Sequence, residues 1–168
     1  MTYSYDGKVG DLSEFSLGVK VYLKAYRWRS IDPVPFSPMS KKLSEARLAL
    51  VSTAGFSLSG QPAFDDKAKG GDWTYRLIPK SSDAQSLIDT HRSKSFDHSG
   101  IRQDPDVAFP IDRARELVAE GRVGSLTEHH LSFMGSLTAT KHLTRESAPA
   151  AAKLLVDEGA EAALLVPV

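Results

Sequence analysis

The feature that most constrains the fold is a helix-then-strand pattern at the C-terminal end of the chain. Residues 145–158 carry apolar side chains at helical spacing, with Thr144 where an N-cap is expected and Gly159 where a C-cap is expected. The apolar run 162–166 follows, and such a run is typical of a strand covered on both faces of a sheet. We therefore predict an interior parallel strand here, with Val168 at its C-terminal edge.

Earlier segments continue the alternation of strands and helices. Residues 47–53 form an apolar run that breaks at Ala54-Gly55, and residues 74–78 form a second strand candidate that Pro79 stops. Pro110 favours a helix start, and Gly121 suits its C-terminal cap. Residues 122–143 are ambiguous. The alternation predicts an α/β layered fold with a mainly parallel sheet, flavodoxin- or Rossmann-like.

The N-terminal part has a different character from the rest. Residues 1–45 carry aromatic side chains and the closely spaced prolines Pro33, Pro35 and Pro38, which interrupt both helix and strand. We expect an irregular N-terminal arm over 1–45, anchored by its rings, and an α/β domain over 46–168.

Composition excludes several classes of protein. The 21 basic and 21 acidic residues give a formal net charge of zero, which argues against a nucleic-acid binder that uses a broad basic surface. No apolar run is long enough for a membrane span, and no secretory signal is evident, so the predicted location is cytoplasmic. Because the chain has no cysteine, it can form neither disulfides nor thiolate metal sites.

The polar stretch 90–104 is the densest collection of reactive side chains. His91 and His98 could act as ligands or as general acid or base, and Asp97 and Asp104 could orient them. The alternative is a solvated loop, which is the simpler interpretation of the residues alone. The spacing matches no compact metal signature, so we predict no metal site.

Two further segments are candidates for substrate binding. Thr53 and Gly55 follow a buried strand, which is where open α/β sheets bind ligands. Phe133 and Met134 lie in a string of small residues that could form a tight turn. The alternatives are a plain strand-to-loop turn for the first pair and a core contact for the second.

Five strings of residues follow one another in a distinctive order. They are Ala-Arg-Leu-Ala-Leu-Val-Ser-Thr-Ala-Gly at 46–55, Gly-Asp-Trp-Thr-Tyr-Arg-Leu-Ile-Pro at 71–79, Phe-Asp-His-Ser at 96–99, Phe-Pro-Ile-Asp-Arg at 109–113 and Ser-Phe-Met-Gly at 132–135. Together they resemble one known family, the selenoprotein B family of glycine, sarcosine, betaine and D-proline reductases. The likeness runs from about Tyr22 to Val168, and the strings are specific as an ordered set rather than singly.

The resemblance implies an activity and a nucleophile. In the family, the strand similar to 162–168 is followed directly by selenocysteine or cysteine, the nucleophile of a reductive carbon–nitrogen cleavage. We therefore expect the 168 residues to be the front part of a longer selenoprotein, cut before the nucleophile and inactive alone. The implied partners are other reductase subunits, one with a pyruvoyl group that binds a small amine or amino acid, and a dithiol reductant; this chain itself would carry no cofactor.

Other interpretations stay open at this point. The chain could be a non-catalytic partner subunit or a small-molecule binding module, or, more remotely, a metal hydrolase that uses its histidines. The reductase interpretation makes a spatial prediction: the loop 90–104 lies within reach of Val168 and forms the polar wall of the site. His98 is the sharper candidate within it, because Phe96 could anchor the loop beside it.

Overall fold

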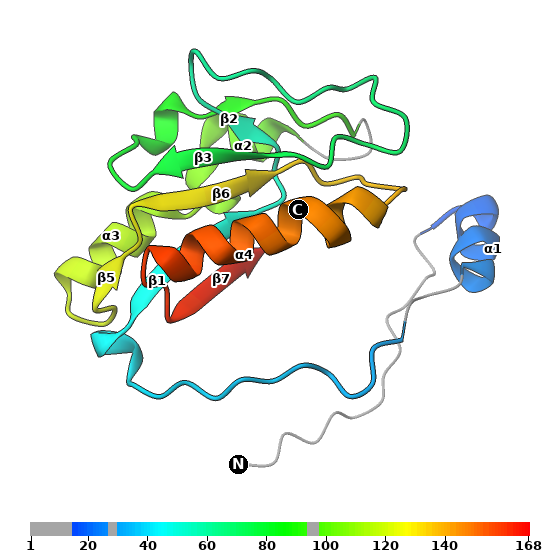
Figure 1. Ribbon diagram of the computed structural model, residues 1–168. Coiled ribbons are helices and arrows are strands. Elements are labelled where there is room, and N and C mark those ends of the chain that lie inside the picture. Colours follow the sequence, from blue (N-terminus) through cyan, green and yellow to red (C-terminus); the bar gives the residue numbers. More distant parts are fainter. Residues whose placement is uncertain (1–14, 27–29, 94–97) are drawn as a thin grey trace. The chain divides into compact units, whose positions relative to one another are not determined.

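The computed structural model describes residues 15–26, 30–93 and 98–168 (Figure 1). Contacts between residues divide the chain into two units, 1–38 and 39–168. In the first unit, α1 (Leu17–Ala25) is a helix with no buried side chain. Within the described residues, the segment expected to be irregular thus contains the helix α1 and a 3-10 turn at 43–45, and its three clustered prolines lie between these two elements.

A five-stranded sheet forms the centre of the second unit. β1 pairs in parallel with β5, β6 and β7, and β3 pairs antiparallel with β6. The prediction of a layered α/β fold with a mainly parallel sheet is confirmed. The strands are β1 (Arg47–Ser52), β3 (Tyr75–Pro79), β5 (Ser125–Leu126), β6 (His129–Phe133) and β7 (Ala162–Val166).

The C-terminal strand β7 is parallel, as predicted, but the prediction that it is interior is wrong. β5 and β6 pair with opposite ends of β1, and β7 pairs along 48–52 of the same strand, so β7 must lie on the other edge of β1. Within the described residues β7 has β1 as its strand partner, and Leu164 and Leu165 are 45% and 68% exposed. An apolar run indicates a strand but does not determine its position in the sheet.

Two helices cover the two faces of the sheet (Figure 1). Successive residues of β1 point to opposite faces, so Leu48 and Leu50 belong to one apolar cluster and Ala49 to the other. The first cluster lies under α3 (Ile111–Ala119), and the second lies under α4 (Ala148–Asp157). Burial on both faces explains why β1 reads as a continuous apolar run.

The helix boundaries follow the sequence signals in part. Gly121 and Gly159 both have positive φ, +70° and +76°, as expected for residues just after α3 and α4. Thr144 is not the N-cap of α4, because it lies inside a π-helical turn, 143–147, and its hydroxyl donates to the carbonyl of Thr140. The α-helical part begins only at Ala148, with Pro149 in its first turn.

Smaller elements complete the second unit. β2 (Phe56–Ser57) and β4 (Ile88–Asp89) form a two-stranded antiparallel sheet next to the main one. α2 (His98–Gln103) is a short helix in the stretch where the sequence showed no helical period. Its one buried side chain is Ile101, which explains why no apolar stripe could be recognised.

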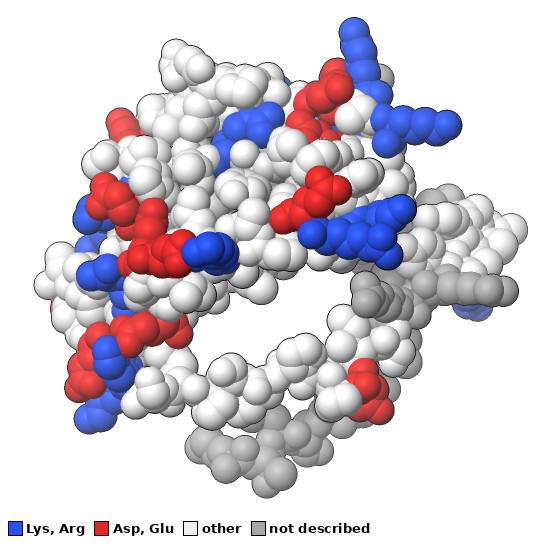
Figure 2. All heavy atoms as spheres, viewed as in Figure 1, with Lys and Arg blue, Asp and Glu red and all other residues white. Residues whose placement is uncertain are grey.

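The surface carries charges of both signs. On the face shown in Figure 2, Lys and Arg side chains lie among Asp and Glu side chains rather than in a broad patch of one sign. Ion pairs of the described residues include Lys153 with Asp157 and Lys80 with Glu128. None of the described helices has the length and apolar character required to cross a membrane.

Candidate active site

The carboxyl ends of β1 and β7 meet at one edge of the sheet, and Thr53 joins them. The backbone N–H of Thr53 donates to the carbonyl of Val166 at 3.1 Å. Its hydroxyl accepts the N–H of Val168 at 2.9 Å and lies 3.4 Å from the Val168 carbonyl oxygen. In open α/β sheets this edge is where ligands bind, so Thr53 fixes the backbone of 166–168 at the start of a candidate site.

Gly55 brings the loop that begins at Thr90 against this edge. Gly55 has φ +68°, and a Cβ placed on it would lie 3.0 Å from the Cα of His91. The carbonyl of Gly55 accepts two hydrogen bonds from Thr90, one from the N–H at 3.1 Å and one from the hydroxyl at 2.5 Å. Glycine is required here because the backbone is left-handed and the neighbouring backbone is in contact.

Gly135 shows how close the His91 ring lies to Val168. A Cβ on Gly135 would lie 2.9 Å from Nε2 of His91, 2.9 Å from the carbonyl oxygen of Thr53 and 3.3 Å from that of Val168. Three polar atoms from segments far apart in the sequence therefore surround one point. The structure brings together His91, Thr53, Gly55 and Val168. The start of the loop 90–104 lies beside Val168, as predicted.

The two candidate histidines have different surroundings. His91 is buried, with 9% of its surface exposed, and burial is the main cause that lowers its pKa, with the nearby charge of His98 adding to it. The pKa of His98 is raised, first by its contact with the carbonyl of Ser93 and then by Asp89. The ring centroids are 6.0 Å apart. Asp97 and Phe96 lie outside the described residues.

The two other predicted binding residues contribute in different ways. The carbonyl of Phe133 accepts the N–H of Gly55 at 2.9 Å, whereas its ring packs against Tyr75 in the apolar cluster under α4. Met134 is 1% exposed, and its Sδ lies 3.4 Å from the N–H of Arg92 in the loop. Both residues therefore stabilise the segments that form the site, at Gly55 and at Arg92.

Sequence reasoning missed three participants: Asp89, Ser93 and Gly135. Asp89 accepts the N–H of His91 at 3.1 Å and contacts Nδ1 of His98 at 2.6 Å. The Asp-Thr-His order at 89–91 is a local signal that could have indicated the first contact, because aspartate often accepts an N–H two residues ahead. The approach of Gly135 depends on tertiary packing and has no such signal.

The remaining histidines have structural partners. Nδ1 of His129 lies 2.6 Å from Glu158, and Nδ1 of His142 lies 2.6 Å from Glu146. Nδ1 of His130 accepts the N–H of Leu50 in the core at 3.2 Å. Among the described residues, no three His, Asp or Glu side chains come together as possible metal ligands.

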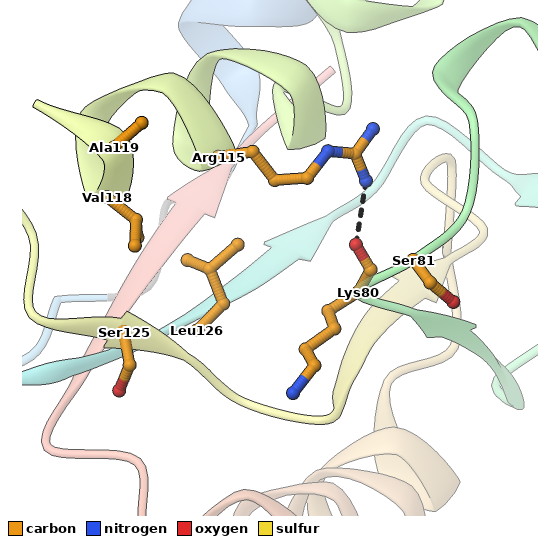
Figure 3. Close-up of a pocket in the computed structure, with 7 residues that line it drawn as sticks. All are labelled: Lys80, Ser81, Arg115, Val118, Ala119, Ser125 and Leu126. Carbon is orange, nitrogen blue, oxygen red and sulfur yellow. Dashed lines mark hydrogen bonds between the residues drawn. The ribbon is translucent and has the colours of Figure 1, made fainter.

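A cavity lies at the other end of the sheet, away from the candidate site (Figure 3). Its volume is about 550 Å³, and Val118 and Leu126 form part of its apolar wall. Both cations at its rim have partners: Arg115 donates to the carbonyl of Lys80 at 2.7 Å, and the Lys80 ammonium pairs with Glu128 at 2.9 Å. The cavity lies by the amino ends of the parallel strands, and we place the candidate site at the opposite edge.

Comparison with known proteins gives a consistent picture. A model of the family described as glycine/sarcosine/betaine reductase selenoprotein B matches residues 16–167. The chain is 31% identical over 136 residues to the D-proline reductase subunit gamma of Acetoanaerobium sticklandii, covering 80% of this chain and 54% of that protein. It is 28% identical over 136 residues to the glycine reductase complex component B subunit gamma of Carboxydothermus hydrogenoformans, covering 81% and 31%.

A third relative is the sarcosine reductase complex component B subunit beta of Peptoclostridium acidaminophilum, 26% identical over 137 residues, with coverage of 80% and 30%. The chain therefore spans about half the length of the first relative and under a third of the other two. No solved structure gives a significant match, so no specific flavodoxin or Rossmann relative is assigned. Because the family match covers nearly the whole chain, this protein belongs to the glycine/sarcosine/betaine reductase selenoprotein B family.

Proposed function

We propose that this chain forms part of a reductase-complex subunit that cleaves a carbon–nitrogen bond of a small amine or amino acid with a selenol or thiol nucleophile. The observation that carries the proposal is the convergence of His91, Thr53 and Val168 at the carboxyl edge of the sheet. In this proposal the nucleophile follows Val168 directly, as the resemblance to the family implies. A residue at that position would follow a backbone segment that is fixed by the hydrogen bond from the Val168 N–H to the Thr53 hydroxyl.

His91 is the group of this chain best suited to meet the reacting atoms. Its Nδ1 accepts the N–H of Ser93 at 3.3 Å, so the proton of the neutral ring lies on Nε2, near the carbonyl of Val168. An N–H there can donate to a selenolate or thiolate, or pass a proton to a departing amine. His98 is less suited, because its two ring nitrogens contact Asp89 and the Ser93 carbonyl.

The proposed reaction balances as follows. The selenolate or thiolate forms a bond to the substrate carbon as the carbon–nitrogen bond breaks, and the amine leaves with the bonding electron pair and takes up a proton. A dithiol then attacks the selenium or sulfur, the carbon leaves with its electron pair and is protonated, and the second thiol releases the reduced nucleophile. The dithiol is oxidised to a disulfide as the substrate carbon is reduced. The chain has no cysteine, so the nucleophile lies outside it.

The partners in this proposal are other reductase subunits, in the cytoplasm. A pyruvoyl group on one of them would supply carbonyl chemistry that binds a primary or secondary amine. The three relatives above are named as components of reductase complexes or as a reductase subunit, which supports a multi-subunit assembly. Phe133 and Met134 would support the wall of the substrate site rather than bind the amine directly.

The gene gives the first test of the proposal. Sequencing downstream of the Val168 codon should reveal an in-frame continuation that begins with a recoded stop codon or a cysteine codon. If no reactive selenol or thiol is encoded there, the chain is better explained as a non-catalytic partner subunit or binding module.

The second test uses the protein that includes this continuation, assembled with its partner subunits. His91→Asn keeps an acceptor for the Ser93 N–H and removes the Nε2 proton, so turnover with a dithiol should fall by about 10²- to 10⁴-fold. His142→Asn is the matched control, because His142 is exposed and pairs with Glu146 on the π-helical turn. Equal activity of the two variants would exclude a role for His91 in the reaction.

A further inference from the structure

Four residues beside the candidate site form a closed ring of hydrogen bonds. One carboxylate oxygen of Asp89 accepts the N–H of His91 at 3.1 Å, and the other lies 2.6 Å from Nδ1 of His98. Nε2 of His98 lies 2.9 Å from the carbonyl oxygen of Ser93. The N–H of Ser93 donates to Nδ1 of His91 at 3.3 Å and closes the ring. Both histidine rings are thus held by neighbours whose roles as donor or acceptor are known.

The contacts determine where the protons lie. A backbone carbonyl can only accept a hydrogen bond, and so can an ionised carboxylate. Both nitrogens of His98 face such acceptors, and these contacts favour the imidazolium form, in which both nitrogens carry a proton. Nδ1 of His91 faces a donor instead, so this nitrogen has no proton and the ring is neutral with its proton on Nε2. The ring of hydrogen bonds therefore gives two histidines of the same loop opposite states.

We propose that Asp89 is the positioning residue of this site: its carboxylate holds His98 as an imidazolium and, through the N–H of His91, directs Nε2 of His91 toward the carbonyl of Val168. This positioning role rests on the function proposed above, because the carbon–nitrogen cleavage proposed there is the reaction that the arrangement would serve. Asp89 stands at the end of β4 and is the only carboxylate in the ring of contacts just described.

The charges around the two rings support this role. Asp89 favours the charged form of His98, and Arg102 on α2, whose Nε lies 3.3 Å from the same carboxylate oxygen, opposes it. Burial lowers the pKa of His91, and the imidazolium of His98 adds to this effect because it disfavours a second positive charge, which outweighs the opposite effect of the Asp89 carboxylate on the pKa of His91. His91 is thereby kept as a neutral donor, and the cationic His98 supplies a favourable field for an anionic nucleophile.

The first test follows the histidine rings by NMR in the 168-residue chain, without any enzymatic readout. At pH 6.5 the ring nitrogen shifts should show His98 protonated on both nitrogens and His91 neutral with its proton on Nε2. In Asp89→Asn the titration midpoint of His98 should fall, whereas in Arg102→Gln it should rise, because the two side chains act on the ring with opposite sign. An unchanged His98 midpoint in Asp89→Asn overturns the proposal.

A matched control separates this effect from a general loss of structure. Asp83 accepts the N–H of Gln85, two residues ahead, at 2.9 Å, in the same pattern that Asp89 uses with His91. Asp83→Asn should leave the titrations of His91 and His98 unchanged. If it shifts them as much as Asp89→Asn does, the effect is a general loss of local order and the proposal is overturned.

The second test measures turnover of the complete reductase complex against pH. Asp89→Asn should lower kcat/KM by about 10- to 100-fold, because it leaves the reacting group in place but misaligned. The pH profile should also change in Asp89→Asn and stay unchanged in Asp83→Asn. Normal turnover of Asp89→Asn overturns the positioning role even if the NMR result is as expected. If the wild-type complex has no turnover, the function proposed above fails, and the NMR titrations still decide whether Asp89 controls the two rings.

Discussion

The buried histidine His130 should make the stability of this protein fall between pH 7.5 and pH 5. Its side chain is fully buried, its Nδ1 accepts the N–H of Leu50, and its Nε2 has no hydrogen-bond partner among residues 15–26, 30–93 and 98–168. Burial is the largest cause that lowers the pKa of His130 from 6.5 to about 4. The folded protein therefore holds this ring neutral over a pH range in which an unfolded chain would protonate it.

The sign and magnitude follow from the two pKa values. Between pH 6.5 and about 4 the unfolded state binds the proton that the folded state excludes, so the free energy of unfolding falls as the pH falls. At about 1.4 kcal/mol for each pH unit between the two values, the full effect is about 3 kcal/mol. Between pH 7.5 and pH 5 the loss from this residue alone is about 2 kcal/mol.

Urea unfolding of the wild type and of His130→Asn at pH 7.5, 6 and 5 isolates this contribution. The asparagine carbonyl can accept the N–H of Leu50 but does not titrate, so the other ionisable groups affect both proteins alike. The wild type should be the more stable of the two at pH 7.5, and this advantage should shrink by about 2 kcal/mol at pH 5. A stability difference that does not change with pH would show that His130 is not held neutral by burial.

Three further predictions concern the backbone of the site, the core beside it and the chemistry. Gly55→Ala should be about 1–2 kcal/mol more destabilising in urea unfolding than Gly60→Ala, since both have positive φ but only the first Cβ meets the backbone of His91; equal costs would refute the close contact. Ser52→Ala should cost about 1–3 kcal/mol in thermal unfolding, because its buried hydroxyl donates to the carbonyl of Ala108 at 2.7 Å, and an unchanged Tm would contradict this. The 168-residue chain, which has no cysteine, should show no dithiol-dependent reductase turnover; reproducible turnover by the metal-free chain would exclude the proposed nucleophile.

Local patterns predicted β1, β3, β7 and the two covering helices α3 and α4, whereas β5 and β6 lie in the stretch 122–143 that the sequence left ambiguous. The apolar run at 47–52 became the central strand because both of its faces are covered by helices. Gly121 and Gly159 marked helix ends because few other residues adopt a left-handed backbone easily. The short helix 98–103 was missed because a single buried side chain gives no helical period.

The candidate site could be predicted only in outline. The sequence pointed to the strand end at Thr53 and to the histidines near it, because reactive side chains after a buried strand are a local signal. It pointed to His98 as the sharper candidate, whereas the contacts favour His91: both nitrogens of His98 face acceptors, and Nε2 of His91 lies beside Gly135 and Val168. Asp97 stays a prediction outside the described residues.

The sequence by itself therefore determined the α/β class, the strands β1, β3 and β7, the helices α3 and α4, and the family, because periodicity, caps and ordered motifs are local features of the chain. Tertiary structure alone decided that β7 lies at an edge of the sheet, since an apolar run is the same in either position. It also decided that Thr53 holds Val168, 115 residues away, and that Gly135 lets the His91 ring approach both. Contacts of this kind depend on how strands pair and how closely backbones pack, which no local pattern specifies.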